Sequence, residues 1–140
     1  SQITVSPITG APIADLHAYL LDILDGQSFS VHLVRSGHSI DLVSATTSKS
    51  RVVEYLDDRI RPRSVLCIGD RGAWPGNDSE LLSHDISLSV DYVSSSLSSC
   101  WNLAPAGLLG PPATLRYLNA LTERDGTVRL SLERLNGGAS

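Results

Sequence analysis

The stretch VLCIGDRGAWPGNDSELL, residues 65–82, decides how this chain is interpreted. Residues 65–69 form a short run of apolar and small side chains, which is typical of a strand covered on both faces of a parallel sheet. The run leads into Asp70, and Asn77 and Asp78 follow after one loop. Ligands of open α/β sheets bind at the carboxyl ends of the strands. The stretch therefore predicts a parallel strand with polar side chains at the end where a ligand would bind.

The residues alone leave two interpretations of these acids open. In the first, Asp70 is a turn residue and Asp78 or Ser79 caps the short helix that follows. In the second, Asp70, Asn77 and Asp78 are oxygen ligands of Mg²⁺, which usually binds one or two protein carboxylates together with substrate phosphate. Lys49, the single lysine beside ten arginines, favours the second because an ammonium at a helix start strengthens anion binding, although chance also explains its position.

Hydrophobic periodicity and turn residues predict the elements on either side. Helices are expected over 12–24, from near Ser48 until Pro62, over 77–82 and over 113–124, and strands over 28–34, 40–43, 65–69, 85–90 and 127–132. The first two strands should form an antiparallel hairpin, and 94–112 should be irregular. The order predicts an α/β protein in which a helix and a hairpin over 1–45 precede a parallel sheet within 46–140.

Each of the three longer helices should bury an apolar face. The expected inward residues are Ile13, Leu16, Leu20, Ile23 and Leu24 in the first helix, Val52, Val53, Leu56 and Ile60 in the second, and Leu115, Leu118 and Leu121 in the third. The strand over 85–90 alternates apolar and polar residues and should be buried on one face only.

Composition narrows the class of protein. The chain has 140 residues, 41% of them hydrophobic and 19% charged, which indicates one globular domain. A net charge of −4 without a basic block predicts no nucleic-acid partner, and the lack of a long apolar run predicts no membrane partner. Cys67 and Cys100 are far apart and are expected to be reduced thiols in a cytoplasmic protein.

Several kinds of catalytic site have no motif here. The sequence has no C-x-x-C, H-E-x-x-H, P-loop or G-x-S-x-G, so the common zinc, nucleotide and serine-hydrolase motifs are missing. The histidines lack ligand spacing and are expected to be ordinary surface or half-buried residues; they are His17, His32, His38 and His84.

A lysine before a helix, an apolar strand that ends in Gly-Asp, and Asn-Asp followed by Glu-Leu-Leu resemble the third and fourth motifs of the haloacid dehalogenase (HAD) superfamily. The resemblance covers residues 28–92 and is strongest for the sugar-phosphatase and Cof-like branch, where a cap hairpin leads directly into the motif-three lysine. It implies part of a HAD-type Rossmann-like parallel sheet with helices on both faces, over 46–140. The α+β segment over 1–45 would then be the end of a cap domain.

The resemblance implies a Mg²⁺-dependent phosphohydrolase that acts on a small phosphorylated metabolite, such as a sugar phosphate, through an aspartyl-phosphate. Lys49 would bind the phosphate and neutralise its charge. Asp70 and Asp78 would hold the metal ion, and Asn77 would orient a ligand or a metal-bound water.

The loop RGAWPG, residues 71–76, departs from the common short form of motif four. Because it lengthens the gap between the two acids, the resemblance does not decide which carboxylate binds the metal directly. Arg71 and Trp74 in this loop would line the substrate entrance or, equally, belong to a solvated loop face.

A second departure is the lack of any D-x-D, since HAD enzymes carry their aspartate nucleophile in such a motif. The family order of motifs places the nucleophile upstream of residue 1, so this chain is expected to be a carboxyl-terminal part that is inactive alone. Its partner would be the missing amino-terminal half or a second copy. The alternative is a non-catalytic HAD-derived binding or assembly module, and D-x-D-x-[TS] in the upstream reading frame would discriminate between the two.

Overall fold

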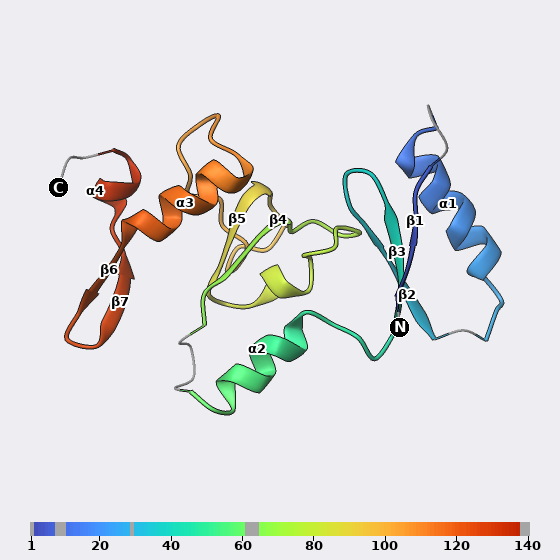
Figure 1. Ribbon diagram of the computed structural model, residues 1–140, viewed down its shortest axis with the longest axis horizontal. Helices are drawn as coiled ribbons and strands as arrows, with labels where there is room; N and C mark the ends of the chain where they lie inside the picture. Colours follow the sequence, from blue (N-terminus) through green and yellow to red (C-terminus); the bar gives the residue numbers. More distant parts are fainter. Residues whose placement is uncertain (1, 8–10, 29, 61–64, 138–140) are drawn as a thin grey trace.

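The computed structural model describes residues 2–7, 11–28, 30–60 and 65–137. Figure 1 shows an antiparallel sheet with one helix at the amino-terminal end, a parallel strand pair in the middle, and a helix with a small hairpin at the carboxyl-terminal end. Among the described residues, no helix is long and apolar enough to cross a membrane.

The amino-terminal sheet has three antiparallel strands in the order β1-β3-β2. The strands are β1 (Gln2–Val5), β2 (Val31–Arg35) and β3 (Ile40–Ser44). β2 and β3 confirm the predicted hairpin, whereas β1 was not anticipated because four largely exposed residues carry little hydrophobic pattern. The strand predicted over 28–34 includes residue 29, which lies outside the described residues.

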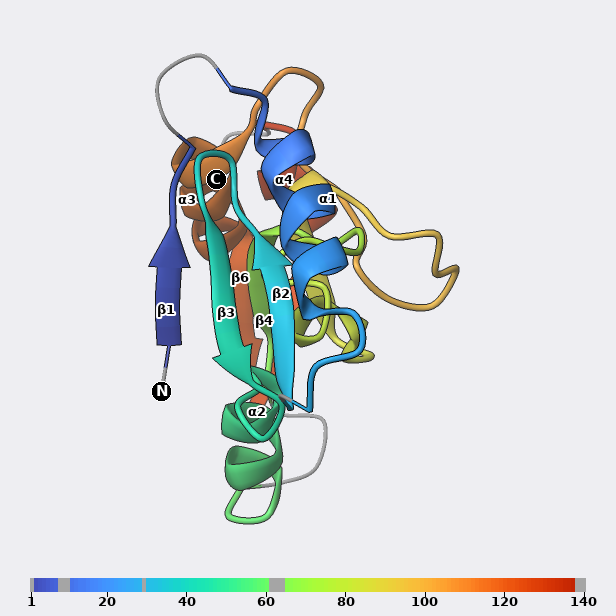
Figure 2. The same cartoon turned by 90° about the vertical axis from the view of Figure 1, so that its right-hand side faces the viewer.

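Helix α1 (Ile13–Leu24) confirms the helix predicted over 12–24 and packs against β2 and β3 (Figure 2). Ile13, Leu16 and Leu20 are at least partly buried, but Ile23 is exposed, so its predicted inward position is wrong. His17 takes the buried position instead. It lies four residues after Ile13 and three before Leu20 and so shares their helix face; the expectation of a surface or half-buried histidine is wrong at this position.

Helix α2 (Ser50–Asp57) starts directly after Lys49 and ends before the expected stop at Pro62, which lies outside the described residues. Val53 is buried and Leu56 is half-buried. Val52 and Ile60 are exposed, so the predicted apolar face is correct only in part.

Two parallel strands, β4 (Cys67–Arg71) and β5 (Ser87–Tyr92), form the centre of the chain. Each is shifted about two residues toward the carboxyl end from its predicted position. All four residues from Ser87 to Val90 are buried, so the expectation that this strand alternates between a buried and an exposed face is wrong. The reason is that α3 lies against β5 and a bridge from Leu88 to Trp101 covers its other edge.

The structure is thus mixed α/β, with small sheets and four α-helices among the described residues. β4 and β5 are the one parallel pair of strands in this part of the chain, so the finer expectation of a HAD-type Rossmann-like sheet stays a prediction. The division of the chain between residues 45 and 46 stays a prediction as well.

The carboxyl-terminal elements are α3 (Gly110–Ala120), β6 (Leu121–Arg124), β7 (Thr127–Leu130) and α4 (Leu132–Leu135). The helix predicted over 113–124 therefore ends early, and its last four residues form a strand. Asp125 and Gly126 both have positive φ and make the two-residue turn that joins β6 to β7. Asp-Gly is a strong hairpin signal that the sequence contained and the helical interpretation overrode.

The face of α3 was also predicted wrongly. Leu115 and Leu118 are exposed, whereas Ala113, Tyr117 and Ala120 are fully buried. These residues join Leu88, Val90 and Leu135 in one apolar cluster, and a second cluster contains Val53, Cys67, Leu82 and Cys100. The small residues allow α3 to lie close to β5, and the phenol of Tyr117 occupies the space between them.

Candidate active site

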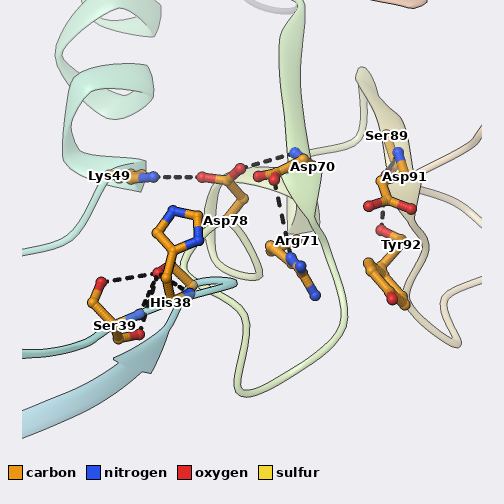
Figure 3. Close-up of polar contacts among 10 residues, drawn as sticks. His38, Ser39, Lys49, Asp70, Arg71, Asp78, Ser89, Asp91 and Tyr92 are labelled. Atoms are coloured by element: carbon orange, nitrogen blue, oxygen red, sulfur yellow. Dashed lines mark hydrogen bonds and ion pairs between the residues drawn. The ribbon is translucent and has the colours of Figure 1, made fainter. Parts of the chain in front are cut away.

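Lys49 and Asp78 meet at the carboxyl end of β4, although they are 29 positions apart in the sequence (Figure 3). Lys49 is the residue directly before α2, and its Nζ donates a hydrogen bond to Oδ1 of Asp78. The lysine side chain is 51% exposed and the carboxylate only 9%, so water reaches the ammonium from the open side. An ammonium held by one anion and still accessible can take a second anionic partner.

Asp78 is held from two sides. Its Oδ2 accepts a hydrogen bond from the backbone N–H of Asp70 at 2.9 Å, while Oδ1 takes Lys49. Burial raises the pKa of Asp78, but these hydrogen bonds and the charge of Lys49 outweigh burial and lower it. Asp78 is therefore a structural anion that positions Lys49 relative to the end of β4.

The capping interpretation of this segment is wrong. The short 3₁₀ helix η1 (Leu81–Ser83) begins after Glu80 and has no side-chain cap, so neither Asp78 nor Ser79 fills that role. The Asp78 side chain bonds to the backbone of β4 and to Lys49 instead.

Gly69 makes the approach of Asp78 possible. A Cβ added at this position would lie 2.5 Å from Oδ2 of Asp78 and 2.8 Å from its Cγ. Such distances are well inside van der Waals contact, so any side chain at residue 69 would displace Asp78. Gly69 therefore leaves the space that the carboxylate of Asp78 occupies next to β4.

Asp70 presents the more accessible carboxylate of the pair, with 53% of its side chain exposed. Its nearest cationic atom is Nε of Arg71, which is 4.0 Å from Oδ2. Burial and the neighbouring Asp78 carboxylate raise the pKa of Asp70, and the charge of Arg71 opposes them only in part. A carboxylate with excess negative charge beside it attracts a cation.

Asn77 directly precedes Asp78 in the chain. Its Oδ1 is buried and has no hydrogen-bond partner among the described residues, while its backbone N–H donates to the carbonyl of Arg35 at 3.3 Å. A buried amide oxygen without a partner is unusual and suits a role as a ligand. Within the described residues no group of three His, Cys, Asp or Glu side chains could hold a metal, so zinc-type sites find no support there.

The donor set fits Mg²⁺ rather than a softer ion. The candidate ligands are carboxylate and amide oxygens, and Mg²⁺ commonly uses one or two protein carboxylates and completes its shell with water and phosphate. Both oxygens of Asp78 are already engaged, whereas those of Asp70 have no hydrogen-bond donor among the described residues. Of the two acids, Asp70 therefore has the carboxylate that is more available to a metal ion. The family resemblance did not decide between them.

A strand irregularity lies beside Asp70. Gly69 pairs with Ser89 but Arg71 pairs with Tyr92, so β5 contains one more residue than β4 over this interval. The buried hydroxyl of Ser89 holds the bulge by donating to the carbonyl of Tyr92 at 2.7 Å and accepting from the N–H of Asp91 at 3.2 Å. Bulges frequently re-aim side chains next to active sites.

The loop over 71–76 contacts the antiparallel sheet. The N–H of Arg35 donates to the carbonyl of Pro75 at 2.9 Å, and Arg35 forms an isolated bridge with Gly76. Trp74 is 75% exposed, and its ring meets that of His17 edge-on with centroids 6.2 Å apart. The loop is therefore anchored by its backbone, while Trp74 faces solvent over much of its surface.

Arg35 and Tyr92 contribute to the candidate site, but the sequence alone did not identify them. The guanidinium of Arg71 lies 4.5 Å above the ring of Tyr92, and Arg35 and Tyr92 line one small cavity with Arg71 and Trp74. No local motif marks either residue, because each reaches the loop only through the folding of a distant strand. His38 remains exposed on the hairpin turn.

In comparisons with known proteins, no family model matches the chain, and no curated protein or solved structure shows significant similarity to it.

Proposed function

We propose that this chain supplies the lysine and the metal-binding acid of a Mg²⁺-dependent HAD-type phosphohydrolase that acts on a small phosphorylated metabolite, such as a sugar phosphate. The supporting observation is the chain of contacts from Lys49 through Asp78 to the backbone of Asp70. It places one accessible ammonium and one accessible carboxylate together at the carboxyl end of a parallel strand.

Each residue has a distinct part in this proposal. The ammonium of Lys49 binds a phosphoryl oxygen and stabilises the negative charge that develops during transfer. Asp78 holds the ammonium in position and touches neither substrate nor metal. Asp70, with Asn77, would hold Mg²⁺, which supplies Lewis-acid stabilisation of the transferring phosphoryl group when bound.

The nucleophile in the proposal is an aspartate outside these 140 residues. Its carboxylate oxygen attacks phosphorus, the bond from phosphorus to the leaving alcohol oxygen breaks, and water later hydrolyses the aspartyl-phosphate to inorganic phosphate. Because the sequence has no D-x-D, the chain alone is expected to be inactive toward p-nitrophenyl phosphate. Cys67 and Cys100, both free and buried, suit the reducing cytoplasm that we propose as its compartment.

The decisive test is Lys49→Met in the complete protein that carries the nucleophile. Losing one charge-stabilising donor typically costs about 10²–10³ in turnover, and we expect at least that loss with p-nitrophenyl phosphate. Arg51→Met is the matched control, because Arg51 is an exposed cation two positions away whose Nη1 contacts only the carbonyl of Thr46. Its turnover should stay near that of the wild type.

A second variant separates chemistry from folding. Lys49→Arg keeps a cation beside Asp78, so the fold should survive, but a planar guanidinium does not place charge as a compact ammonium does. We expect native-like melting and a turnover still far below that of the wild type. Turnover of Lys49→Met within a few-fold of the wild type would overturn the proposal and favour a non-catalytic binding or assembly module.

A further inference from the structure

A small cavity of about 160 Å³ lies beside Asp70, between the end of β2 and the loop over 71–76. The residues that line it are Arg35, Arg71, Ala73, Trp74, Pro75, Gly76 and Tyr92. Ligand pockets for whole drug-sized molecules are usually above roughly 300 Å³, so this cavity has room for one functional group rather than for a complete cofactor.

The polar lining of the cavity is cationic. Within the part of the chain that the structure describes, no carboxylate lies within ion-pair distance of Arg35, and Arg71 approaches Asp70 only at 4.0 Å. Nε of Arg71 is buried and has no hydrogen-bond partner among the described residues. Two arginines among the lining residues give the cavity a positive charge, which favours a bound anion.

Contacts hold the guanidinium of Arg71 and the backbone of Arg35 in place. The Arg71 guanidinium rests on the ring of Tyr92, and the backbone of Arg35 is hydrogen-bonded to Pro75 and Asn77. A side chain that is already held, as that of Arg71 is, binds more tightly because it loses little freedom on binding. Guanidinium groups match the planar or tetrahedral arrangement of oxygens in carboxylates and phosphates.

We propose that Arg35 and Arg71 form a subsite for a second oxyanion of the substrate. This inference rests on the proposed function, and it specifies the substrate class: a small phosphomonoester that carries a second phosphate or a carboxylate. The reacting phosphate lies at Lys49 and Asp70, and the second anion occupies the adjacent cavity because Nε of Arg71 lies 4.0 Å from Oδ2 of Asp70. Trp74 packs on the carbon skeleton between the two groups.

The test compares three probes that differ in the second group: glycerol phosphate, phosphoglycerate and propanediol bisphosphate. Binding to the complete protein is measured by calorimetry in EDTA, so that no turnover occurs. We expect phosphoglycerate or the bisphosphate to bind at least tenfold more tightly than glycerol phosphate, a ratio that corresponds to about 1.4 kcal/mol. Whichever probe is preferred identifies the second group as carboxylate or phosphate.

Arg35→Gln and Arg71→Gln should each bring that affinity ratio close to one. Arg129→Gln is the matched control, because it removes the same charge from an exposed position on β7 and should leave the ratio unchanged. A wild-type ratio near one would overturn the subsite. An equal loss in Arg129→Gln would also overturn it, since net charge rather than the cavity would then set the preference.

Hydrolysis of the same probes with Mg²⁺ tells the two proposals apart. Equal efficiency on all three would sustain the phosphohydrolase and reject the subsite. Selective binding that both arginine variants abolish, without hydrolysis of any probe, would sustain the oxyanion site and reject the phosphohydrolase.

Discussion

The two sheet-forming regions of this chain have similar strand lengths but very different interiors. In residues 2–44, the antiparallel sheet and α1 bury only His17 and Ile40 among the described positions. In residues 65–137, one apolar cluster joins β5 to α3, and most of a second lies beside β4, where Val53 of α2 completes it. A strand pattern in a sequence therefore indicates local conformation and does not by itself indicate a core.

The difference assigns a different role to each region. Asp70 belongs to the parallel pair and its N–H binds the Asp78 carboxylate, and most of the buried apolar residues lie in the same region, so this region determines stability and the geometry of the candidate site. The antiparallel sheet contributes Arg35 and the backbone contacts that anchor the loop over 71–76. The candidate subsite lies where the two regions meet.

The largest expected effect is association of the chain through the free edge of β4. It tests whether the parallel pair, unlike the antiparallel sheet, needs a partner strand. β4 pairs with β5 on one side, and no described strand pairs with its other side. Unpaired N–H and C=O groups beside apolar residues favour pairing with another strand. We therefore predict that the chain forms a dimer through this edge, with an affinity near micromolar or about 8 kcal/mol.

Light scattering on the isolated chain measures this directly. A molar mass of twice the monomer at micromolar concentration is the expected result. A monomer that persists at high concentration would contradict the prediction and would mean that β4 needs no partner.

A smaller effect is expected from Tyr117→Ala, which tests where stability resides. The phenol oxygen accepts from the N–H groups of Leu103 and Ala104 at 2.9 Å and lies 2.9 Å from the carbonyl of Ser89. Truncating a fully buried aromatic ring should lower the free energy of unfolding by about 3–5 kcal/mol, measured by urea denaturation.

Val31→Ala on β2 is the comparison variant for Tyr117→Ala. Val31 is partly exposed at the edge of the antiparallel sheet, so its truncation should change the free energy of unfolding by no more than about 0.5 kcal/mol. Equal losses in the two variants would break the comparison, because the antiparallel sheet would then carry as much stability as the parallel pair.

The smallest effect is expected from Asp70→Asn in the absence of metal. The pKa of Asp70 is raised in the fold, so its ionisation destabilises the folded state as pH rises above the unperturbed value of about 3.9. The variant should melt higher than the wild type at pH 7, by at most about 2 °C because the carboxylate is half-exposed.

Two measurements check the role of Asp70: the pH dependence of the melting difference, and the effect of Mg²⁺ on the melting temperature. The melting difference should vanish as pH falls below about 3.9, where Asp70 is protonated in both states. Asp78, whose pKa is lowered, works in the opposite sense: its contribution is present above that pH and is lost in more acidic solution. Mg²⁺ should stabilise the wild type only, and equal stabilisation of Asp70→Asn would contradict the role of Asp70 as a ligand.

Much of the secondary structure was predictable because local rules determine it. Helical spacing over 12–24 predicts α1, and a short apolar run before Gly-Asp predicts β4. The Asp125-Gly126 turn was equally local, but leucine spacing suggested a longer helix and the turn signal was overridden. That error concerned the weighting of two local signals.

The sequence by itself determined which chemical groups this chain offers near residue 70: one lysine, two aspartates and an asparagine at helix and strand ends. Only the tertiary structure decided that Asp78 holds Lys49 while Asp70 stays accessible, and that Arg35 joins Arg71 at one cavity. The physical reason is range: hydrogen bonds, ion pairs and side-chain contacts act over a few ångströms, and residues many positions apart come that close only when packed strands and loops bring them together.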